Sequence, residues 1–203
     1  MLKIGITGNI GSGKTTVCHI FETLGIPVYY ADHRGKFLLE SNENVKAKVL
    51  AAFGDGICGP NNNINRALLA DIVFHDTAKL TLLESIIHPA IFDDFNLWVA
   101  LQNSPYILKE AALLFEAGTY KKLDKVVTVT APFQTRLQRV QLRSQTTEEQ
   151  VRARENRQWP EEKKIERADY VIYNNEEQLL LPQVLKLHKL FLSLQNGNKI
   201  PGM

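Results

Sequence analysis

The chain has 203 residues, of which 44% are hydrophobic and 23% charged, and its formal net charge is +2 at pH 7. A chain of this length can bury one sizeable core with room for an insertion, and the composition is that of a soluble globular protein. The small net charge gives no argument for a nucleic-acid or membrane partner. Cys18 and Cys58 have no paired spacing, so the sequence predicts neither a disulfide framework nor a zinc site.

The apolar run at the N-terminus is too short for a signal peptide. No stretch of the sequence approaches the roughly 18 apolar residues that a membrane span needs. We therefore expect a cytoplasmic protein that binds neither a membrane nor a nucleic acid.

Short apolar segments alternate with helix-period segments along most of the chain, a pattern typical of an α/β fold with a parallel sheet. The first strand is expected at Leu2–Thr7 and the first helix at Lys14–Leu24, with Gly25 ending this helix in a left-handed conformation. The second strand is expected at Pro27–Ala31. Later strands are expected at Tyr106–Lys109, Lys125–Thr130 and Tyr170–Tyr173, and later helices at Phe133–Arg143 and Glu176–Leu194.

The alternation stops between Ser41 and Asn103, where the pattern indicates helices only. Pro89 is expected to start the last of these helices, because proline is tolerated in a first turn. Apolar residues recur at helical spacing, so we interpret this block as a helical insertion with an apolar face of its own. That face consists of Leu80, Leu83, Ile87, Ile91 and Phe95, and the expected helices are Asn44–Phe53, Asn65–Phe74, Ala78–Ile87 and Pro89–Leu101.

A second insertion follows the helix at Phe133–Arg143 and is rich in arginine. Thr146 and Glu149 have the spacing of a capping box, which predicts a helix from there to about Gln158. Few apolar residues would anchor this segment, so we interpret it as a mobile lid.

The segment between the first strand and the first helix matches the phosphate-loop pattern G-x-x-x-x-G-K-[ST]. Glycines in such a loop let consecutive N–H groups point at phosphate oxygens, and the helix N-terminus adds partial positive charge. Lys14 is expected to contact the β- and γ-phosphates of ATP, and the Thr15 hydroxyl to coordinate Mg²⁺. The predicted nucleotide-binding residues are Gly8, Asn9, Ile10, Gly11, Ser12, Gly13, Lys14, Thr15 and Thr16.

A phosphate loop alone does not define the reaction. A GTPase normally carries an Asn-Lys-x-Asp element after a core strand, and this sequence has none. A small-molecule kinase explains more, since it must place an acceptor hydroxyl in line with the γ-phosphate and exclude water. Asp32 follows the second strand, at the sheet edge where ligands bind, and is expected to take or orient the hydroxyl proton. The alternative is that Asp32 caps a helix over residues 33–40.

Arg139 and Arg143 are four residues apart and so share one helix face. A guanidinium group grips phosphate oxygens at two points, so we favour phosphate clamping over a solvated face paired with glutamates. An RNA-binding stripe is disfavoured because no aromatic residues interleave residues 136–157.

Together with further segments, the motifs above form a set that follows one order along the chain. This set resembles the dephospho-CoA kinase family from Leu2 to about Leu194. The phosphate loop is the specific motif of this set, and Ala31-Asp32 resembles the end of the family's Asp-Ala-Asp element. The other segments are Asn65-Arg66-Ala67-Leu68-Leu69, His88-Pro89, Leu113-Leu114-Phe115-Glu116, Arg139 and Arg143, Gln158, and Ala168-Asp169-Tyr170-Val171-Ile172-Tyr173-Asn174.

This resemblance implies transfer of the γ-phosphoryl group of ATP to the 3′-hydroxyl of dephospho-CoA, with Mg²⁺, in the last step of coenzyme A synthesis. It implies that Asp32 is the candidate base, that Arg66 and His88 lie on the acceptor side, and that Asn174 lies near the adenine. The implied architecture is a three-layer P-loop kinase fold. Its parts are core at 1–40, a helical acceptor domain at 41–104, core at 105–139, a lid at 140–164 and core at 165–203.

Four positions depart from the family pattern. Tyr30 stands in place of the first aspartate of Asp-Ala-Asp, and Ser144 replaces an aspartate after Arg143. Glu110 and Ala112 replace the usual aspartate and proline before Leu113-Leu114. Because Glu110 ends a hydrophobic strand, we expect it to serve Mg²⁺ directly or through water. Two alternatives stay open: a P-loop kinase of another nucleoside or nucleotide, and a non-catalytic nucleotide sensor.

Overall fold

The computed structural model describes residues 1–59 and 63–195 and divides the chain into two compact units. The first unit comprises residues 1–30 and the chain from 102 onward, and it contains the sheet. The second unit, residues 31–101, is helical.

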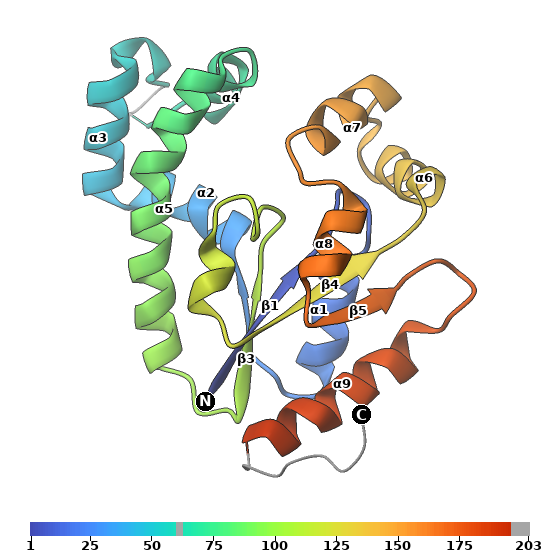
Figure 1. Ribbon diagram of the computed structural model, residues 1–203. Helices are drawn as coiled ribbons and strands as arrows, with labels where there is room; N and C mark the ends of the chain where they lie inside the picture. The colour runs from blue at the N-terminus through green and yellow to red at the C-terminus, as the bar shows by residue number, and fades with distance from the viewer. Residues whose placement is uncertain (60–62, 196–203) are drawn as a thin grey trace. The chain divides into compact units, whose positions relative to one another are not determined.

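The sheet of the first unit is parallel throughout its described residues, as the alternating pattern predicted (Figure 1). Its strands are β1 (Leu2–Thr7), β2 (Val28–Tyr30), β3 (Tyr106–Glu110), β4 (Lys125–Thr130) and β5 (Tyr170–Tyr173). The strand order is β2-β3-β1-β4-β5, with Ile6 of the central strand aligned with Glu110 on one side and Val127 on the other. The carboxyl ends of these strands therefore share one edge, where ligands bind in α/β sheets.

Helices α1 (Lys14–Thr23) and α9 (Leu180–Gln195) form one apolar core with the sheet. Phe21 of α1 stacks on Phe191 of α9, and both residues are fully buried. A polar contact also ties α9 to the sheet, because the Tyr106 hydroxyl lies 2.6 Å from Nδ1 of His188. Gly25 follows α1 with φ +79°, so the predicted left-handed helix end is confirmed.

Helix α8 (Glu161–Arg167) packs on the other face of β4. Val127 and Val129 of β4 belong to the core with α1 and α9, whereas the intervening Thr128 hydroxyl donates to the backbone oxygen of Lys164 at 3.4 Å. This alternation is what a strand covered on both faces requires. The short helix η3 (Thr119–Lys122) lies between β3 and β4 in the chain.

Helices α6 (Phe133–Ser144) and α7 (Glu148–Glu155) follow β4 and share a small apolar cluster of their own. Leu137, Val140 and Val151 are its buried members, with Ile10 and Phe133 packed against them. Ile10 belongs to the loop after β1, so this cluster joins the two helices to that loop.

The helical unit has a separate apolar core that includes Leu39, Val49 and Leu69. Its elements are α2 (Ala31–Ser41), α3 (Glu43–Phe53), η1 (Asp55–Ile57), α4 (Arg66–Phe74) and α5 (Thr77–Ala100). The N-termini of α3, α4 and α5 are capped by the side chains of Asn42, Asn65 and Asp76, each accepting a backbone N–H three residues on.

Helix α5 corrects the sequence-based prediction of two helices separated at Pro89. It runs unbroken from Thr77 to Ala100 with Pro89 inside it. An interior proline removes one backbone hydrogen bond and usually ends or kinks a helix. Here residues on both sides of Pro89 pack on the core of the helical unit, Leu83 and Ile87 before it and Ala90 after it. Tertiary packing therefore outweighs the local effect of Pro89.

Two other helix boundaries also differ from those predicted. The capping box of α7 uses Thr147 and Gln150, one residue later than predicted, because the Thr146 hydroxyl is buried against the Ser144 hydroxyl at 2.7 Å. Helix α9 begins at Leu180 instead of Glu176, because the Asn175 side chain accepts the N–H groups of the next turn and Glu176 has φ +69°. Helix α8 was not predicted at all.

Candidate active site

The loop between β1 and α1, residues 8–13, has the form of an anion-binding cradle. Lys14 is almost buried, and its Nζ donates to the backbone oxygens of Gly8 at 2.9 Å and Asn9 at 3.4 Å. No side chain caps the N-terminus of α1. Within the described residues, Asn9 Oδ1 and Ser12 Oγ are buried without a hydrogen-bond partner. The Ser12 hydroxyl, which can donate, and the uncapped helix N-terminus at the same point favour a bound phosphate group.

Asn174 and Arg139 meet at this loop, although Asn174 directly follows β5 and Arg139 lies in α6. Asn174 Nδ2 donates to the backbone oxygen of Ser12 at 2.8 Å. Arg139 Nη2 donates in turn to the backbone oxygen of Asn174 at 3.2 Å and lies 3.3 Å from a carboxylate oxygen of Glu176. A methyl group added at Gly13 would come within 2.2 Å of Asn174 Nδ2. Asn174 thus contacts the loop directly, and it links Arg139 to the loop.

The remaining predicted residues of the α/β unit lie in different surroundings. Arg143 is exposed in the last turn of α6. Thr15 is exposed in the first turn of α1, and Glu110 is the buried last residue of β3. Burial raises the pKa of the Cys18 thiol, and the negative charge of Glu110 raises it further. In the sheet, Glu110 is aligned with Ile6, two residues before the phosphate loop begins at Gly8.

A network of side chains behind the loop was only partly anticipated from the sequence. The Ile10 N–H donates to Gln158 Oε1 at 2.8 Å, and the Ile10 backbone oxygen accepts from Arg136 Nη1 at 3.3 Å. Gln158 Nε2 donates to the backbone oxygen of Ala112 at 3.2 Å. Gln158 was part of the family resemblance, whereas Arg136 was not singled out. No signal in the sequence distinguishes Arg136 from a surface arginine.

Lys164 is a second buried cation in this region. Its Nζ lies 3.0 Å from Glu116 Oε1 and 3.2 Å from the backbone oxygen of Ala112. Burial lowers the pKa of Lys164, and the neighbouring Glu116 opposes that shift. The same carboxylate oxygen accepts the Trp159 N–H at 2.6 Å, so this pair fixes the chain between α7 and α8.

Three predicted residues belong to the helical unit. Asp32 is the exposed second residue of α2, so the alternative that it is an N-cap is wrong. Arg66 is the first residue of α4 and pairs with Glu40 at 2.7 Å, both side chains being about half exposed. His88 lies inside α5 and is half-buried, so it does not precede a helix as predicted.

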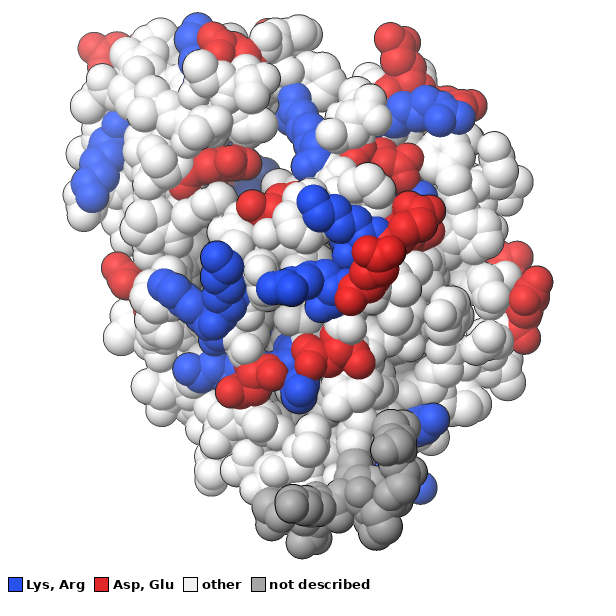
Figure 2. All heavy atoms as spheres, viewed as in Figure 1, with Lys and Arg blue, Asp and Glu red and all other residues white. Residues whose placement is uncertain are grey.

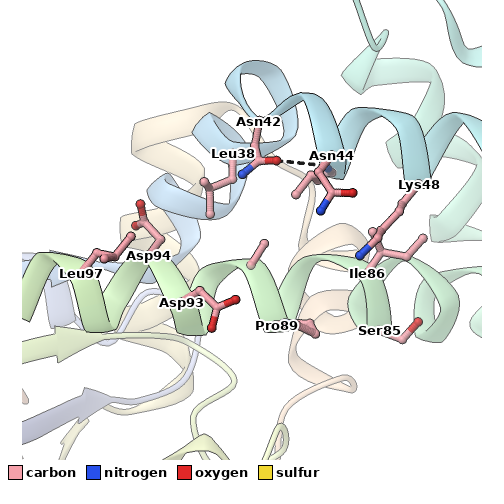
Figure 3. Close-up of a pocket in the computed structure, with 12 residues that line it drawn as sticks. Leu38, Asn42, Asn44, Lys48, Ser85, Ile86, Pro89, Asp93, Asp94 and Leu97 are labelled. Carbon is pink, nitrogen blue, oxygen red and sulfur yellow. Dashed lines mark hydrogen bonds between the residues drawn. The ribbon is translucent and has the colours of Figure 1, made fainter.

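The helical unit also contains a groove between α2, α3 and α5, with a volume of about 330 Å³ (Figure 3). Its apolar lining includes Leu38, Ile86 and Leu97, and Figure 3 shows Lys48 extending from α3 toward α5 near Ile86. Asp32, Arg66 and His88 do not line this groove. The remaining lining residues are Asn42, Asn44, Val45, Ser85, Pro89, Ala90, Asp93 and Asp94.

Charged side chains of both signs are interspersed on the surface shown in Figure 2. The pair Lys125 and Asp169, 2.8 Å apart, is one example from the α/β unit. The face in view therefore has no large area of a single sign. Across residues 1–59 and 63–195, no helix has the length and apolar composition needed to cross a membrane.

The chain is similar in sequence to known proteins over most of its length. The family model described as dephospho-CoA kinase matches residues 2–179. The chain belongs to the dephospho-CoA kinase family. A dephospho-CoA kinase from Salinibacter ruber is 39% identical over 178 residues, covering 86% of this chain and 89% of that protein.

Solved structures agree with the assignment to the dephospho-CoA kinase family. The protein TT1252 from Thermus thermophilus has a TM-score of 0.81 at 33% identity, covering 95% of this chain and 97% of that one. A dephospho-CoA kinase from Campylobacter jejuni has a TM-score of 0.67 at 25% identity, covering 97% of this chain and 98% of that one. The predicted P-loop kinase fold and the family resemblance are both confirmed.

The contact between Gly13 and Asn174 gives a test of the nucleotide site in this member of the dephospho-CoA kinase family. Gly13 and Gly25 have φ values of +95° and +79°, so alanine at either position should cost about 1–2 kcal/mol of stability. Only at Gly13 would the new methyl group strike Asn174, because Gly25 has no such neighbour within 4 Å. We expect Gly13→Ala to weaken ATP binding at least about tenfold in calorimetry, with Gly25→Ala as the matched control. Equal ATP affinity in the two variants would exclude Asn174 from the nucleotide site.

Proposed function

We propose that this protein transfers the γ-phosphoryl group of ATP to the 3′-hydroxyl of dephospho-CoA, giving coenzyme A and ADP. The observation that carries the proposal is the phosphate loop, whose buried Lys14 and uncapped α1 N-terminus form an anion cradle in a chain of this family. Phosphoryl transfer needs little covalent chemistry from the protein, so positioning and charge stabilisation account for most of the catalysis.

Lys14 and Arg139 are the cations proposed to stabilise charge on the transferring group. Lys14 is held by loop carbonyls that point its ammonium group along the cradle. Arg139 Nη2 is engaged with Asn174, and Nη1 is buried without a hydrogen-bond partner among the described residues. We assign Nη1 to a phosphate oxygen and Asn174 to the adenine side. Arg143 is exposed and is proposed to join when the lid at 140–164 closes.

Thr15 and Glu110 fit Mg²⁺, which takes one or two protein oxygen donors together with substrate phosphates. Among the described residues no cluster of three or more His, Cys, Asp or Glu side chains is suited to a metal, in keeping with such a sparse site. The register that aligns Glu110 with Ile6, two residues before the phosphate loop, supports a carboxylate beside that loop. When bound, Mg²⁺ would neutralise charge on the β- and γ-phosphates.

Asp32 is proposed to accept or orient the proton of the acceptor hydroxyl. It follows β2 by two residues in the chain, is exposed, and is not used as a helix cap. A carboxylate in hydrogen-bond reach of the hydroxyl would contribute general-base catalysis. Arg66 and His88 remain proposed acceptor-side residues.

The groove of the helical unit is proposed to hold the pantetheine arm of dephospho-CoA. That arm is uncharged and carries two amides between short apolar segments. The groove offers an apolar lining together with the amide groups of Asn42 and Asn44. Asp94 is held by a two-point pair with Arg34, which offsets its charge at the groove. A neutral arm with amides therefore fits this lining better than a pyrophosphate.

The proposed reaction is tested by measuring ADP release from Mg·ATP with and without dephospho-CoA, alongside a panel of nucleosides and nucleoside monophosphates. We expect ADP release that depends on dephospho-CoA, with coenzyme A as the product. If a nucleoside and not dephospho-CoA stimulated ADP release, the protein would still be a kinase, but its acceptor would be that nucleoside. Tight ATP binding without release on any acceptor would favour a nucleotide sensor.

The role of Asp32 is tested by Asp32→Asn, which keeps the shape of the side chain and removes its basicity. We expect kcat to fall by about 100-fold or more while the Kd for ATP stays near that of the wild type. Steady-state kinetics and calorimetry give the two quantities. A loss of ATP affinity with little change in kcat would contradict the assignment.

The role of the groove is tested by Ala90→Leu, which adds three carbon atoms to its lining. We expect the KM for dephospho-CoA to rise about tenfold while the KM for ATP is unchanged, because overfilling a packed site costs about 1–3 kcal/mol. Ala47→Leu is the matched control, since Ala47 is exposed on α3 and does not line the groove. If the KM for dephospho-CoA is unchanged in a stably folded Ala90→Leu protein, the pantetheine arm binds outside this groove.

A further inference from the structure

Arg136 is a charged residue that the proposed reaction does not use, yet it is only 3% exposed. A buried guanidinium is costly unless it is paired and its donors are satisfied. All three nitrogens of Arg136 have partners: Nε donates to the Ala131 backbone oxygen at 2.8 Å, Nη1 to Ile10 and Nη2 to Glu155. The side chain therefore connects three separate segments of the α/β unit.

The first of these connections fixes a peptide of the phosphate loop. The Ile10 backbone oxygen accepts from Arg136 Nη1 at 3.3 Å, while the Ile10 N–H is held by Gln158. The Ile10 side chain also packs on the apolar cluster of α6 and α7. Both backbone groups of Ile10 are thus used outside the cradle. These two groups belong to the peptides on either side of Ile10, so turning either peptide would break a hydrogen bond, and Arg136 and Gln158 together favour one conformation of the loop.

The second connection reaches α7. Arg136 Nη2 and Glu155 Oε1 are 2.6 Å apart, and Glu161 lies 3.9 Å from Nε. Helix α7 has a single buried residue among its eight, Val151, so apolar packing alone holds it weakly. The pair with Glu155 therefore adds a polar contact that helps to position α7, the helix in the segment expected to act as a lid.

We propose that Arg136 is a positioning residue that couples occupancy of the phosphate loop by nucleotide to the position of α7. The coupling rests on the ATP-binding part of the proposed function and not on the identity of the acceptor. Nucleotide phosphates stabilise the loop conformation in which the Ile10 oxygen faces Arg136. That conformation holds the guanidinium where it pairs with Glu155, so ATP orders α7, and by reciprocity an ordered α7 strengthens ATP binding.

Hydrogen exchange of the full chain, with and without Mg·ATP and without acceptor, tests this coupling. In the wild type we expect ATP to slow exchange both in the loop at residues 8–15 and in α7. In Glu155→Ala the loop should remain protected, while the ATP-dependent protection of α7 should fall at least about threefold. Glu148→Ala is the matched control, because Glu148 lies on the same helix and pairs with Arg152 at the surface. This control should keep the wild-type response.

Arg136→Lys supplies a second variant that retains the positive charge. A lysine cannot reach Ala131, Ile10 and Glu155 together, since it lacks the planar fork. We expect Arg136→Lys to weaken ATP binding by about fivefold. Adding Glu155→Ala to this variant should weaken ATP binding no further, because both substitutions break the same connection between the loop and α7.

Three outcomes would count against the coupling. ATP-dependent protection of the loop but not of α7 in the wild type would overturn it and leave the nucleotide site intact. Equal loss of α7 protection in Glu155→Ala and Glu148→Ala would also overturn it. Protection in neither segment of the wild type would overturn the nucleotide assignment together with the coupling.

Discussion

The phosphate loop has to hold one shape while keeping its inward N–H groups for a ligand, and most of the α/β unit is arranged to meet this constraint. The shape of the loop is therefore fixed by contacts that the rest of the α/β unit makes with its outer side. Strand β1 fixes its start in the centre of the sheet, and the packing of α1 on that sheet fixes its end. Asn174 holds the backbone oxygen of Ser12, and Arg136 and Gln158 hold the two backbone groups of Ile10. Each of these contacts uses a loop group that a bound phosphate does not need.

The helical unit offers an extended groove and not a cradle, which is what the proposed acceptor with its long flexible arm would need. Helix α5 supplies one side of the groove over several turns, from Ser85 to Leu97, and it can do so because it continues through Pro89. Had the helix ended at Ile87, the two halves would not share one axis along the groove. A proline inside a helix also leaves one carbonyl without its usual partner. At Pro89 that carbonyl belongs to Ser85, which is itself a residue that lines the groove.

Local sequence patterns predicted the parts of the fold that are determined locally. The β1 strand, the loop and α1 were predicted because glycine spacing and a strand-to-helix context are properties of adjacent residues. Helix α5 and the capping box of α7 were mispredicted because packing decided them, through the apolar core of the helical unit in one case and the buried Thr146 hydroxyl in the other. Arg136 was missed for a further reason. Its partners Glu155 and Ile10 are 19 and 126 residues away, and a buried arginine looks the same in a sequence as an exposed one.

Arg136 and Lys164 are two buried cations close to the loop. The geometry that they impose on their hydrogen-bond partners explains their presence better than a contribution to the stability of the fold. Burying an ion pair costs desolvation that its own attraction often fails to offset, and an apolar replacement of similar size is frequently as stable. Apolar side chains would pack the same space but would leave the Ile10 oxygen without its donor from Arg136 and the Ala112 oxygen without its donor from Lys164. A guanidinium or ammonium group fixes the direction of its partners as well as their distance. A loop that must present its N–H groups to phosphate needs that directional control, which non-directional apolar contacts cannot provide.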